Sequence, residues 1–587
     1  MDLARLEAAY QTARTELLAA RGRHGHWEGR LASSSLSTAT AVSALAIVQR
    51  EDPSANVQPL IDAGVKYLAG QQNHDGGFGD TDKSHSNIAT TYLVIAAMHL
   101  AKREAEFATL LSRAWKYIES KSGISGLKER YGVDKTFVVP IMTNLALAGL
   151  CDWKEISPLP FELACIPQSW YRFAQMPVVS YAIPALVAIG QAHYFHCKPW
   201  NPYSRIVRGL SVNRSLRVLL KMQPQSGGYL EATPLTSFVV MSLAATGRAQ
   251  HAVTQAGVRF IKDSMRDDGS WPIDTNLATW VTSLSINALG RDVEQFVDDR
   301  CWGWLLSCQH KQRHPFTGAD PGGWGWTDLS GAVPDADDTP GALLALDIWH
   351  ARDERPQKMN DAIVGAAFEG VHWLLGLQNR DGGWPTFCRG WGKLPFDRSG
   401  TDLTAHAIRA LTEWEWLEPQ LVAQPIERGF RYLADKQNPD GSWSPLWFGN
   451  QEHPTEDNPI YGTAKVLLAY RDTVRMSDPA AQRGISWLAH QQNADGSFGS
   501  SMEETALAVE SLLAAHEAHA PAVDRGLAWL VGRVERGEHR HSSPIGFYFA
   551  KLWYYEELYP LIFTVSTLRL AVSTLRVAAE KLHSPAR

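Results

Sequence analysis

The 587-residue sequence predicts an all-α protein in which paired helices close into barrels. Three observations indicate this class. A helix–turn–helix unit recurs along the chain, the segments after its turns carry apolar residues at helical spacing, and alternating β-branched runs bounded by hairpin turns are missing. Because each unit has an apolar face that only a neighbouring unit can cover, paired helices closing into barrels are the simplest arrangement.

The repeat is clearest at residues 370–384, where a helical stretch through Leu374 is followed by Gln378, a turn and Trp384. Glycine permits positive φ, and Asn and Asp side chains bond their own backbone, so each Asn-x-Asp-Gly stretch ends one helix before the next begins. The Gln and the aromatic residue are predicted to cap and stack on a neighbouring helix end. Other copies span residues 64–78, 429–443 and 484–498, and weaker copies end at Tyr229, Trp271 and Trp324.

Helical periodicity is strongest just after two of these turns. Residues 401–411 and 503–512 place apolar side chains at i, i+3, i+4 and i+7, which predicts one buried face for each helix. The chain is too long for one ordinary core, so two substantial domains are expected.

The composition excludes one class of partner and favours another. A net charge of −6 and the absence of a long Lys/Arg cluster argue against nucleic acid, which requires a basic footprint. The 22 Trp, 17 Tyr and 19 Phe residues are unusually many, so aromatic surface is expected to serve the function.

The N-terminus indicates where in the cell the protein is expected, and the cysteines indicate whether it binds metal. Residues 1–7 lack the basic and apolar regions of a signal peptide and predict an amphipathic helix, so we expect a cytoplasmic protein. No apolar run reaches the ~18 residues that cross a bilayer. The six cysteines include no Cys-x-x-Cys pair, and no His cluster has metal spacing, so no disulfide, metal or cofactor is expected.

The motif that points to chemistry is Asp335-Ala336-Asp337-Asp338-Thr339. Grouped carboxylates cannot all ionise together, so one of them should keep a proton at neutral pH. Thr339 and Pro340 predict the N-cap and first residue of a helix whose dipole stabilises the conjugate base. Such an acid could protonate an isolated alkene, which is a very weak base. Taken alone, however, the motif is more often a solvated helix cap.

Four further local patterns follow one another along the chain. They are residues 321–326 before the acidic motif, residues 403–406 (Leu-Thr-Ala-His), residues 460–463 (Ile-Tyr-Gly-Thr) and residues 547–560. Together they resemble the squalene-hopene cyclase family, the class II terpene cyclases with QW repeats, over nearly the whole chain. The resemblance implies two α/α barrels, one inserted in the other, with the active-site cavity between them. It places the inserted barrel at residues 32–268, and residues 1–31 and 269–587 form the barrel with the acidic motif.

The resemblance also implies the reaction and its residues. The enzyme would be an isomerase that protonates a linear polyprene such as squalene and cyclises it through a carbocation cascade. It assigns the proton to Asp337, with Asp335 and Asp338 as partners, and a polarising role to His406, for which we expect a cationic imidazole. Aromatic faces would stabilise the migrating cation. The implied cavity wall consists of Trp326, Phe387, Trp447, Tyr461, Tyr181, one of the pair Phe547 and Tyr548, and Tyr555 nearby.

The sequence departs from the family pattern where substrate length and termination are decided. Ile273 stands where the family usually has Trp, Thr40 where it has Glu, and Phe387 where it has Tyr. Glu231 is a candidate to assist water or deprotonation, although a surface glutamate is the more common identity. The class II chemistry therefore carries over better than the hopene product, and a diterpenoid diphosphate, a longer polyprene or a meroterpenoid are alternative substrates.

A membrane surface is the expected source of an insoluble polyprene. Residues 204–221 interleave apolar and basic side chains after an aromatic stretch, as interfacial helices do, and an ordinary surface helix fits the pattern equally well. The family is monotopic, so the resemblance implies a peripheral protein on the cytoplasmic side of the cell membrane. A homodimer is left open.

Three other functions compete with this reading. An inverting glycoside hydrolase on an α/α barrel would need a second carboxylate across the cleft, and no motif nominates one. A prenyltransferase-like barrel would need an Asp, Cys and His zinc set. A non-catalytic lipid-binding protein would have no need of the acidic triplet and His406.

Overall fold

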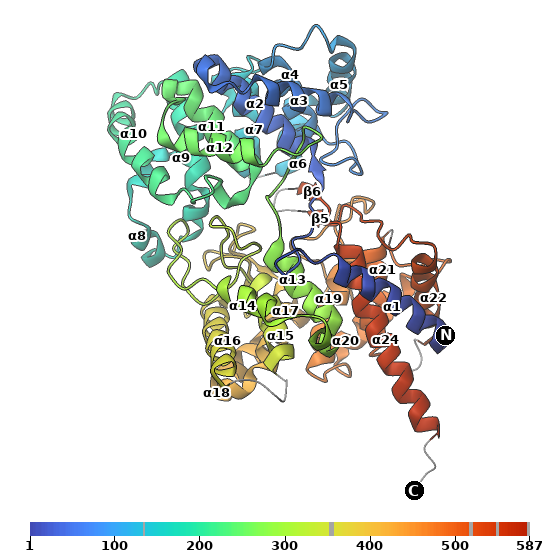
Figure 1. The fold of residues 1–587 in the computed structure, drawn as a ribbon. Coiled ribbons are helices and arrows are strands. Elements are labelled where there is room, and N and C mark those ends of the chain that lie inside the picture. The colour runs from blue at the N-terminus through green and yellow to red at the C-terminus, as the bar shows by residue number, and fades with distance from the viewer. Residues whose placement is uncertain (133–134, 351–356, 500, 516–519, 548–550, 584–587) are drawn as a thin grey trace.

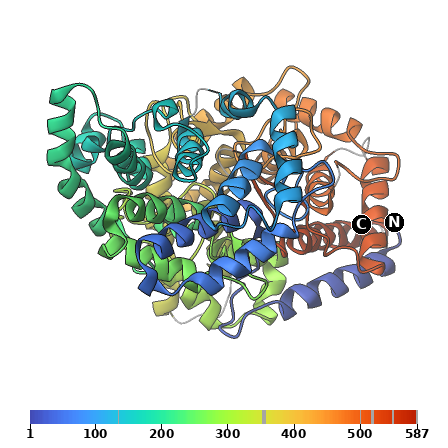
Figure 2. The ribbon, with the colours of Figure 1, turned by 90° about the horizontal axis from the view of Figure 1, so that it is seen from above.

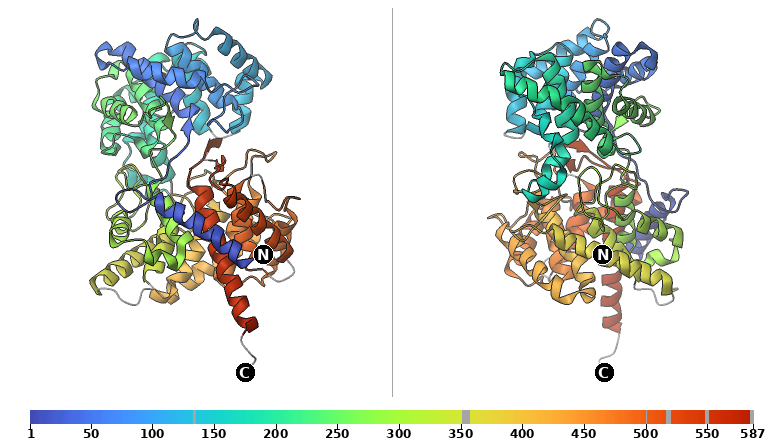
Figure 3. Two further views of the ribbon diagram at one scale, coloured as in Figure 1. Left: turned by 45° about the vertical axis from the view of Figure 1, so that its right-hand side comes forward. Right: turned by 90° about the vertical axis from the view of Figure 1, so that its left-hand side faces the viewer.

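The computed structural model describes residues 1–587 except 133–134, 351–356, 500, 516–519, 548–550 and 584–587. Its helices form two bodies that lie end to end (Figure 1). Figure 2 shows the molecule from above, and both views of Figure 3 show helix α24 extending beyond the lower body towards the C-terminus. The predicted all-α class is confirmed.

The upper body is a barrel whose inner ring contains α2, α4, α7, α9 and α11. Each of these helices contacts the next, and α11 closes the ring on α2. The other helices of the body lie outside this ring. The bounds are α2 Ser35–Glu51, α3 Gln58–Ala69, α4 Ile88–Leu100, α5 Ala108–Ser120, α6 Gly123–Tyr131, α7 Lys135–Leu147, α8 Gln168–Phe173, α9 Val178–His196, α10 Pro202–Met222, α11 Thr233–Leu243 and α12 Ala252–Asp263.

The lower body closes in the same way around α13, α15, α17, α19, α21 and α24, with α24 returning to α13. An outer helix packs on most members of this ring, as α16 does on α15 and α18 on α17. The bounds are α1 Leu3–Ala19, α13 Ala278–Leu289, α14 Asp299–Ser307, α15 Asp338–His350, α16 Gln357–Leu377, α17 Thr401–Glu413, α18 Pro419–Asp435, α19 Pro459–Asp472, α20 Pro479–His490, α21 Met502–Leu512, α22 Ala520–Glu535 and α24 Tyr559–His583.

The chain passes between the bodies at a short antiparallel pair, β1 Ser33–Ser34 with β2 Trp271–Pro272. The N-terminal helix α1 packs on α24 and α22, so it belongs to the lower body although its sequence precedes the upper one. The predicted boundaries at residues 32 and 268 lie beside this crossing. The other strand pairs are β3 Trp384–Pro385 with β4 Ser399–Gly400, and β5 Gly546–Phe547 with β6 Leu552–Tyr554.

The repeat turns join consecutive helix pairs by a recurring set of hydrogen bonds. The buried Trp384 indole donates to the Leu374 carbonyl in the last turn of α16 (2.9 Å), so it caps that helix end. The Gln378 amide donates to the carbonyls of Gly382 (2.7 Å) and Pro425 (2.9 Å), which ties the turn to α18. The same Gln pattern is found at Gln72, Gln223, Gln309, Gln437 and Gln492, and the same indole pattern at Trp271, Trp324 and Trp443.

Among the described residues, two helices are long and apolar enough to cross a membrane by length and composition, α9 and residues Tyr559–Val577 of α24. The sequence-based prediction that no stretch reaches this length is therefore wrong. Most of each stretch is buried inside the protein, 67% and 56%, because α9 packs on α11 and α24 packs on α1 and α21. Both helices serve as members of the barrel cores.

Candidate active site

The acidic motif lies at the start of inner helix α15. One oxygen of Asp335 accepts the backbone N–H groups of Asp337 (2.8 Å) and Asp338 (2.7 Å), which satisfies donors that the helix start leaves unpaired. The helix begins at Asp338, so the prediction of Thr339 as N-cap is wrong. The reason is that the Thr339 hydroxyl is bonded to both backbone groups of Trp324, in the preceding repeat turn (2.9 and 3.2 Å).

His406 reaches this motif from α17, the next helix of the inner ring. Its Nδ1 atom lies 3.0 Å from Oδ1 of Asp337, and the imidazole is 2% exposed. Asp402 lies four residues earlier on the same helix, so the helical repeat places it on the same face as His406. The two predicted partners, Asp337 and His406, therefore meet, and their catalytic roles stay predictions.

Burial governs the protonation of the carboxyl cluster. It raises the pKa of Asp337 to about 6 and that of Asp335 to about 7. The pKa of Asp338 lies well above its usual range because of burial first and then the neighbouring Asp335 charge. The cluster thus retains protons near neutral pH, and desolvation outweighs the mutual repulsion on which the sequence-based argument rested.

The imidazole of His406 is neutral in this environment. Burial, followed by the charges of Lys465 and Arg409, holds its pKa well below the usual range. The expected cationic imidazole is therefore wrong. A neutral ring with a proton on Nδ1 can still donate to Oδ1 of Asp337, which leaves the other carboxyl oxygen to carry the acidic proton.

Aromatic side chains surround the acid. A cavity of about 90 Å³ lies directly against the three aspartates. Phe387 stands at its edge, with ring centres 6.1 Å from Trp326, 6.3 Å from Trp447 and 5.3 Å from Tyr181. These are four of the predicted cage residues. The lining of the small cavity comprises Leu277, Trp280, Trp326, Asp335, Asp337, Asp338, Thr386, Phe387, Trp447, Phe448 and Tyr554.

A second cavity of about 1090 Å³ adjoins the first. Phe387 lines both, and Tyr181 lines the larger one. The outer parts of this cavity carry exposed side chains, among them Trp391 and Arg389. The larger cavity therefore connects the protein surface with the wall of the acid site.

Two further predicted wall residues, Tyr461 and Ile273, line neither cavity. Tyr461 is fully buried and stacks on Phe448, with ring centres 4.6 Å apart, outside the residues that line either cavity. Ile273 is buried and lines neither cavity, and its carbonyl accepts the N–H of Thr233. Phe547 is the second residue of β5. Tyr548 lies outside the described residues.

Tyr555 points away from the acid. Its hydroxyl donates to Asp82 of the upper body (2.9 Å), and the Lys83 ammonium lies 4.2 Å from its ring centre. The preceding residue, Tyr554, is the one that lines the acid cavity. The two tyrosines belong to opposite faces of a strand end, which the sequence could not orient without the tertiary structure.

Other cavity residues were missed, and some left a signal. Trp280 and Phe448 line the acid cavity but follow no motif. Asp402 could have been found from its i, i+4 spacing to His406, and burial raises its pKa to about 7. Lys465 was also missed, although a lysine within the apolar stretch of residues 464–469 signals a buried charge.

Glu231 differs from expectation too. The side chain is fully buried, so its assignment to the surface is wrong. One carboxylate oxygen accepts the Ser226 hydroxyl and the Gly331 N–H, both at 2.7 Å, and both residues lie in turns. Glu231 therefore joins the upper body to the loop that leads to the acidic motif.

Similarity to known proteins agrees with this geometry. The model of the squalene-hopene cyclase N-terminal domain matches residues 10–190, and the model of the C-terminal domain matches residues 276–569. The squalene–hopene cyclase of Bradyrhizobium diazoefficiens is 24% identical over 95% of this chain and 94% of its own length. Enfumafungin synthase of Hormonema carpetanum is 24% identical over 90% of this chain, which spans 45% of that longer protein. The ent-copalyl diphosphate synthase structure from Streptomyces platensis shares the fold, with a TM-score of 0.55, 19% identity and coverage of 97% of this chain and 99% of its own.

Proposed function

The chain belongs to the squalene-hopene cyclase family, and from this we propose that it is a class II terpene cyclase that converts a linear polyprene such as squalene into a polycyclic product. The observation that carries the proposal is the contact between Asp337 and His406 at an aromatic-walled cavity. A protonated buried carboxyl beside apolar aromatic walls suits alkene protonation, because water is excluded and no nucleophile competes for the cation.

The first step uses groups of this chain alone. The O–H bond of Asp337 breaks as a C–H bond forms at the terminal alkene carbon, which leaves a carboxylate and a tertiary carbocation. His406 holds the other carboxyl oxygen, so the acidic proton points to the cavity rather than into the helix bundle. As rings close, the faces of Trp326, Phe387 and Trp447 stabilise the cation by roughly 0.5 to 2 kcal/mol each. Loss of a proton or capture of water ends the cascade.

The substrate enters from a membrane surface in this proposal. Trp170, Phe173 and Trp200 are 69%, 93% and 99% exposed. Phe173 ends α8, next to Arg172 at the wall of the larger cavity. Such aromatic exposure is costly in water and favourable at a bilayer interface, so it supports a peripheral membrane protein, which we propose lies on the cytoplasmic side of the cell membrane. On α10, Tyr203, Ile206 and Leu210 are exposed as well.

An isoprenoid with an anionic head is a second candidate substrate. The outer part of the larger cavity contains Arg380 and Arg389, both exposed, and acidic Asp381 nearby. Two arginines could bind a diphosphate, whereas squalene would leave them unused. This observation concerns the head of the substrate and leaves the protonation step unchanged.

The test is a substrate panel. Purified protein in detergent is incubated with squalene, a longer polyprene, geranylgeranyl diphosphate and a prenylated aromatic acid, and products are identified by gas chromatography and mass spectrometry. We expect a cyclic product from at least one substrate, its loss in Asp337→Asn, and its retention in Asp361→Asn, an exposed control on α16. Equal turnover by Asp337→Asn and the wild type would overturn the proposal.

A further inference from the structure

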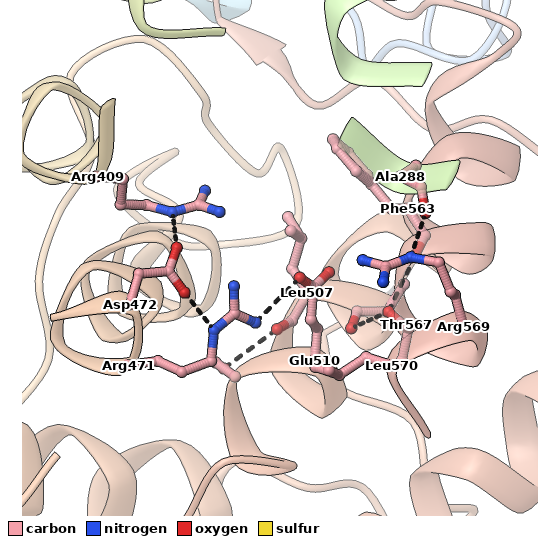
Figure 4. A network of polar contacts seen from close by, with 12 residues as sticks. Ala288, Arg409, Arg471, Asp472, Leu507, Glu510, Phe563, Thr567, Arg569 and Leu570 are labelled. Carbon is pink, nitrogen blue, oxygen red and sulfur yellow. Dashed lines mark hydrogen bonds and ion pairs between the residues drawn. The ribbon is translucent and has the colours of Figure 1, made fainter. Parts of the chain in front are cut away.

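Ion pairs hold α19 against α17, the helix that carries His406. The Arg409 guanidinium binds Asp472 (2.6 Å), which joins the two helices, and Asp472 also binds Arg471 (2.6 Å). Arg471 then reaches Glu510 on α21 (3.3 Å), as Figure 4 shows. These ion pairs link three consecutive helices of the inner ring. They hold α19 at one register beside the His406 face of α17.

In this register, Lys465 of α19 lies within the barrel core behind the acid. The residue is only 6% exposed, and its Nζ atom lies 5.9 Å from the ring centre of Tyr461, one turn earlier on the helix. Lys465 is absent from the lining of both cavities. The ammonium group is therefore shielded from water and from the substrate.

The charges around Lys465 come from three directions. Asp337 acts on it from the segment before α15, Asp402 and Arg409 from α17, and Glu510 from α21. In turn Lys465 acts on Asp337, Asp402 and His406. Burial lowers the pKa of the ammonium group, and Asp337 is the first of the charges that oppose this shift. Because an isolated buried cation is strongly unfavourable, the ammonium ion favours the ionised form of the carboxyl groups around it.

The other titratable groups around Lys465 are neutral or already paired. His406 is neutral, Arg409 is paired with Asp472, and Glu510 is paired with Arg471. In the described part of the chain, no carboxylate oxygen lies within 4.0 Å of the Lys465 ammonium. Its charge is thus available to the acid cluster rather than consumed by one close ion pair.

We propose that Lys465 is the counter-cation of the acid: its ammonium ion stabilises the carboxylate that Asp337 leaves when it transfers its proton to the alkene. The inference rests on the proposed function and deepens it. When the Asp337 O–H bond breaks, a carbocation forms in the cavity and Asp337 becomes a carboxylate. The two opposite charges attract each other. A cation on the far side of the carboxylate opposes return of the proton. Lys465 thus takes the role that a charged imidazole would otherwise fill. It acts through Asp337 and does not contact the substrate.

The first test compares the neutral variants Lys465→Met and Lys465→Gln with Lys465→Arg, which keeps the charge. In the neutral variants we expect kcat to fall by about tenfold or more, the effect of one pKa unit, with KM nearly unchanged because Lys465 does not line the cavity. The alkaline limit of the rate profile should move to higher pH, since Asp337 becomes a weaker acid. Lys465→Arg should restore both, and Lys436→Met, at an exposed position after α18, should change neither.

A second measurement does not depend on turnover. Infrared difference spectroscopy of the resting protein follows the protonated carboxyl band that Asp337→Asn removes. In the folded neutral variants this band should persist about one pH unit higher than in the wild type. An unchanged band in both would overturn the role of Lys465 even if every substrate were turned over. A shifted band in a protein that cyclises no substrate would support Lys465 and overturn the proposed function instead. A uniform loss of kcat without a pH shift would assign Lys465 a structural role only.

Discussion

The Nδ1 atom of His406 lies 3.0 Å from Oδ1 of Asp337, a contact that joins residues 69 positions apart in the chain. Helix α17 supplies His406, and Asp337 directly precedes the neighbouring helix α15. The two side chains are 2% and 17% exposed. One carboxyl oxygen is thereby fixed by the imidazole, and in the proposed mechanism the other carries the proton that is transferred. The following predictions concern this contact, the cavity that it faces and the structure that holds it.

Removal of the imidazole should slow protonation without preventing folding. His406→Phe keeps a ring in the same volume but loses the hydrogen bond to Asp337, so we expect turnover to fall by about 100-fold. His406→Asn, whose amide can donate, should fall less. Initial rates and circular dichroism of both variants check this. A folded Phe variant with wild-type turnover would show that the contact plays no part in the acid step.

Turnover should decline as the pH rises above the pKa of Asp337. The active form carries the proton, and burial raises the pKa of Asp337 to about 6, so the rate should fall roughly tenfold per pH unit above about pH 6. A pH profile of kcat in detergent measures this limit. A kcat that stays constant between about pH 5 and about pH 8 would be inconsistent with Asp337 as the acid.

The same raised pKa values make stability depend on pH. Asp335, Asp337 and Asp402 bind protons more tightly in the folded chain, where their pKa values are about 7, 6 and 7, than in the unfolded chain, at about 4. Their contribution to the free energy of unfolding is full below about pH 4 and is lost as the pH rises through 6 to 7. Thermal unfolding of Asp402→Asn should lose part of this pH dependence, and identical curves would contradict it.

Phe387 should control how far the cascade proceeds. It lines both cavities and contacts Trp326, Trp447 and Tyr181. Replacement by Ala removes one cation-stabilising face and lets water nearer, so we expect more partly cyclised or hydroxylated products and a lower total rate. Product ratios by mass spectrometry test this. Phe430→Leu, in outer helix α18, serves as a control whose product ratios should stay those of the wild type.

The repeat tryptophans should matter for stability rather than chemistry. Trp384→Phe removes the indole bond to Leu374 and leaves a buried gap, so the free energy of unfolding should fall by about 1 to 3 kcal/mol. Trp391→Phe, at a position 61% exposed, should change it by less than about 0.5 kcal/mol. Denaturant unfolding compares the two, and equal losses would contradict the capping role.

The aromatic surface of α8 should bind lipid. Trp170→Ser and Phe173→Ser remove the two most exposed apolar side chains of this helix, so sedimentation with phospholipid vesicles should fall several-fold. Activity on substrate dissolved in detergent should be retained, because neither residue lines the acid cavity. Unchanged vesicle binding by the double variant would place the membrane contact elsewhere.

Much of the fold could be predicted from local patterns. The Gln-to-Trp repeats indicate helix pairs, and their turns occur where glycine and Asp residues require them, as Gly382 shows with φ of 93°. The helix of residues 401–411 and the acidic motif before α15 were also evident. Local chemistry decides such features because each involves neighbours within one or two helical turns.

The acid's partner could be named only through the resemblance, and its protonation state was misjudged. Whether His406 is charged depends on burial and on Lys465 and Arg409, which only the packed helices bring near it. The choice between Tyr554 and Tyr555 depends on which face of a strand end meets the cavity. Neither quantity follows from spacing along the chain.

The sequence by itself determined that the chain forms paired helices, where their turns lie, and that an acidic motif stands before an inner helix. Tertiary structure alone decided that Asp337 meets His406, that Phe387 lines both cavities, and that Lys465 is buried in the barrel core. The physical reason is that helices and turns result from short-range backbone preferences, whereas acid strength results from desolvation and from charges on separate helices, which exist only after the barrels close.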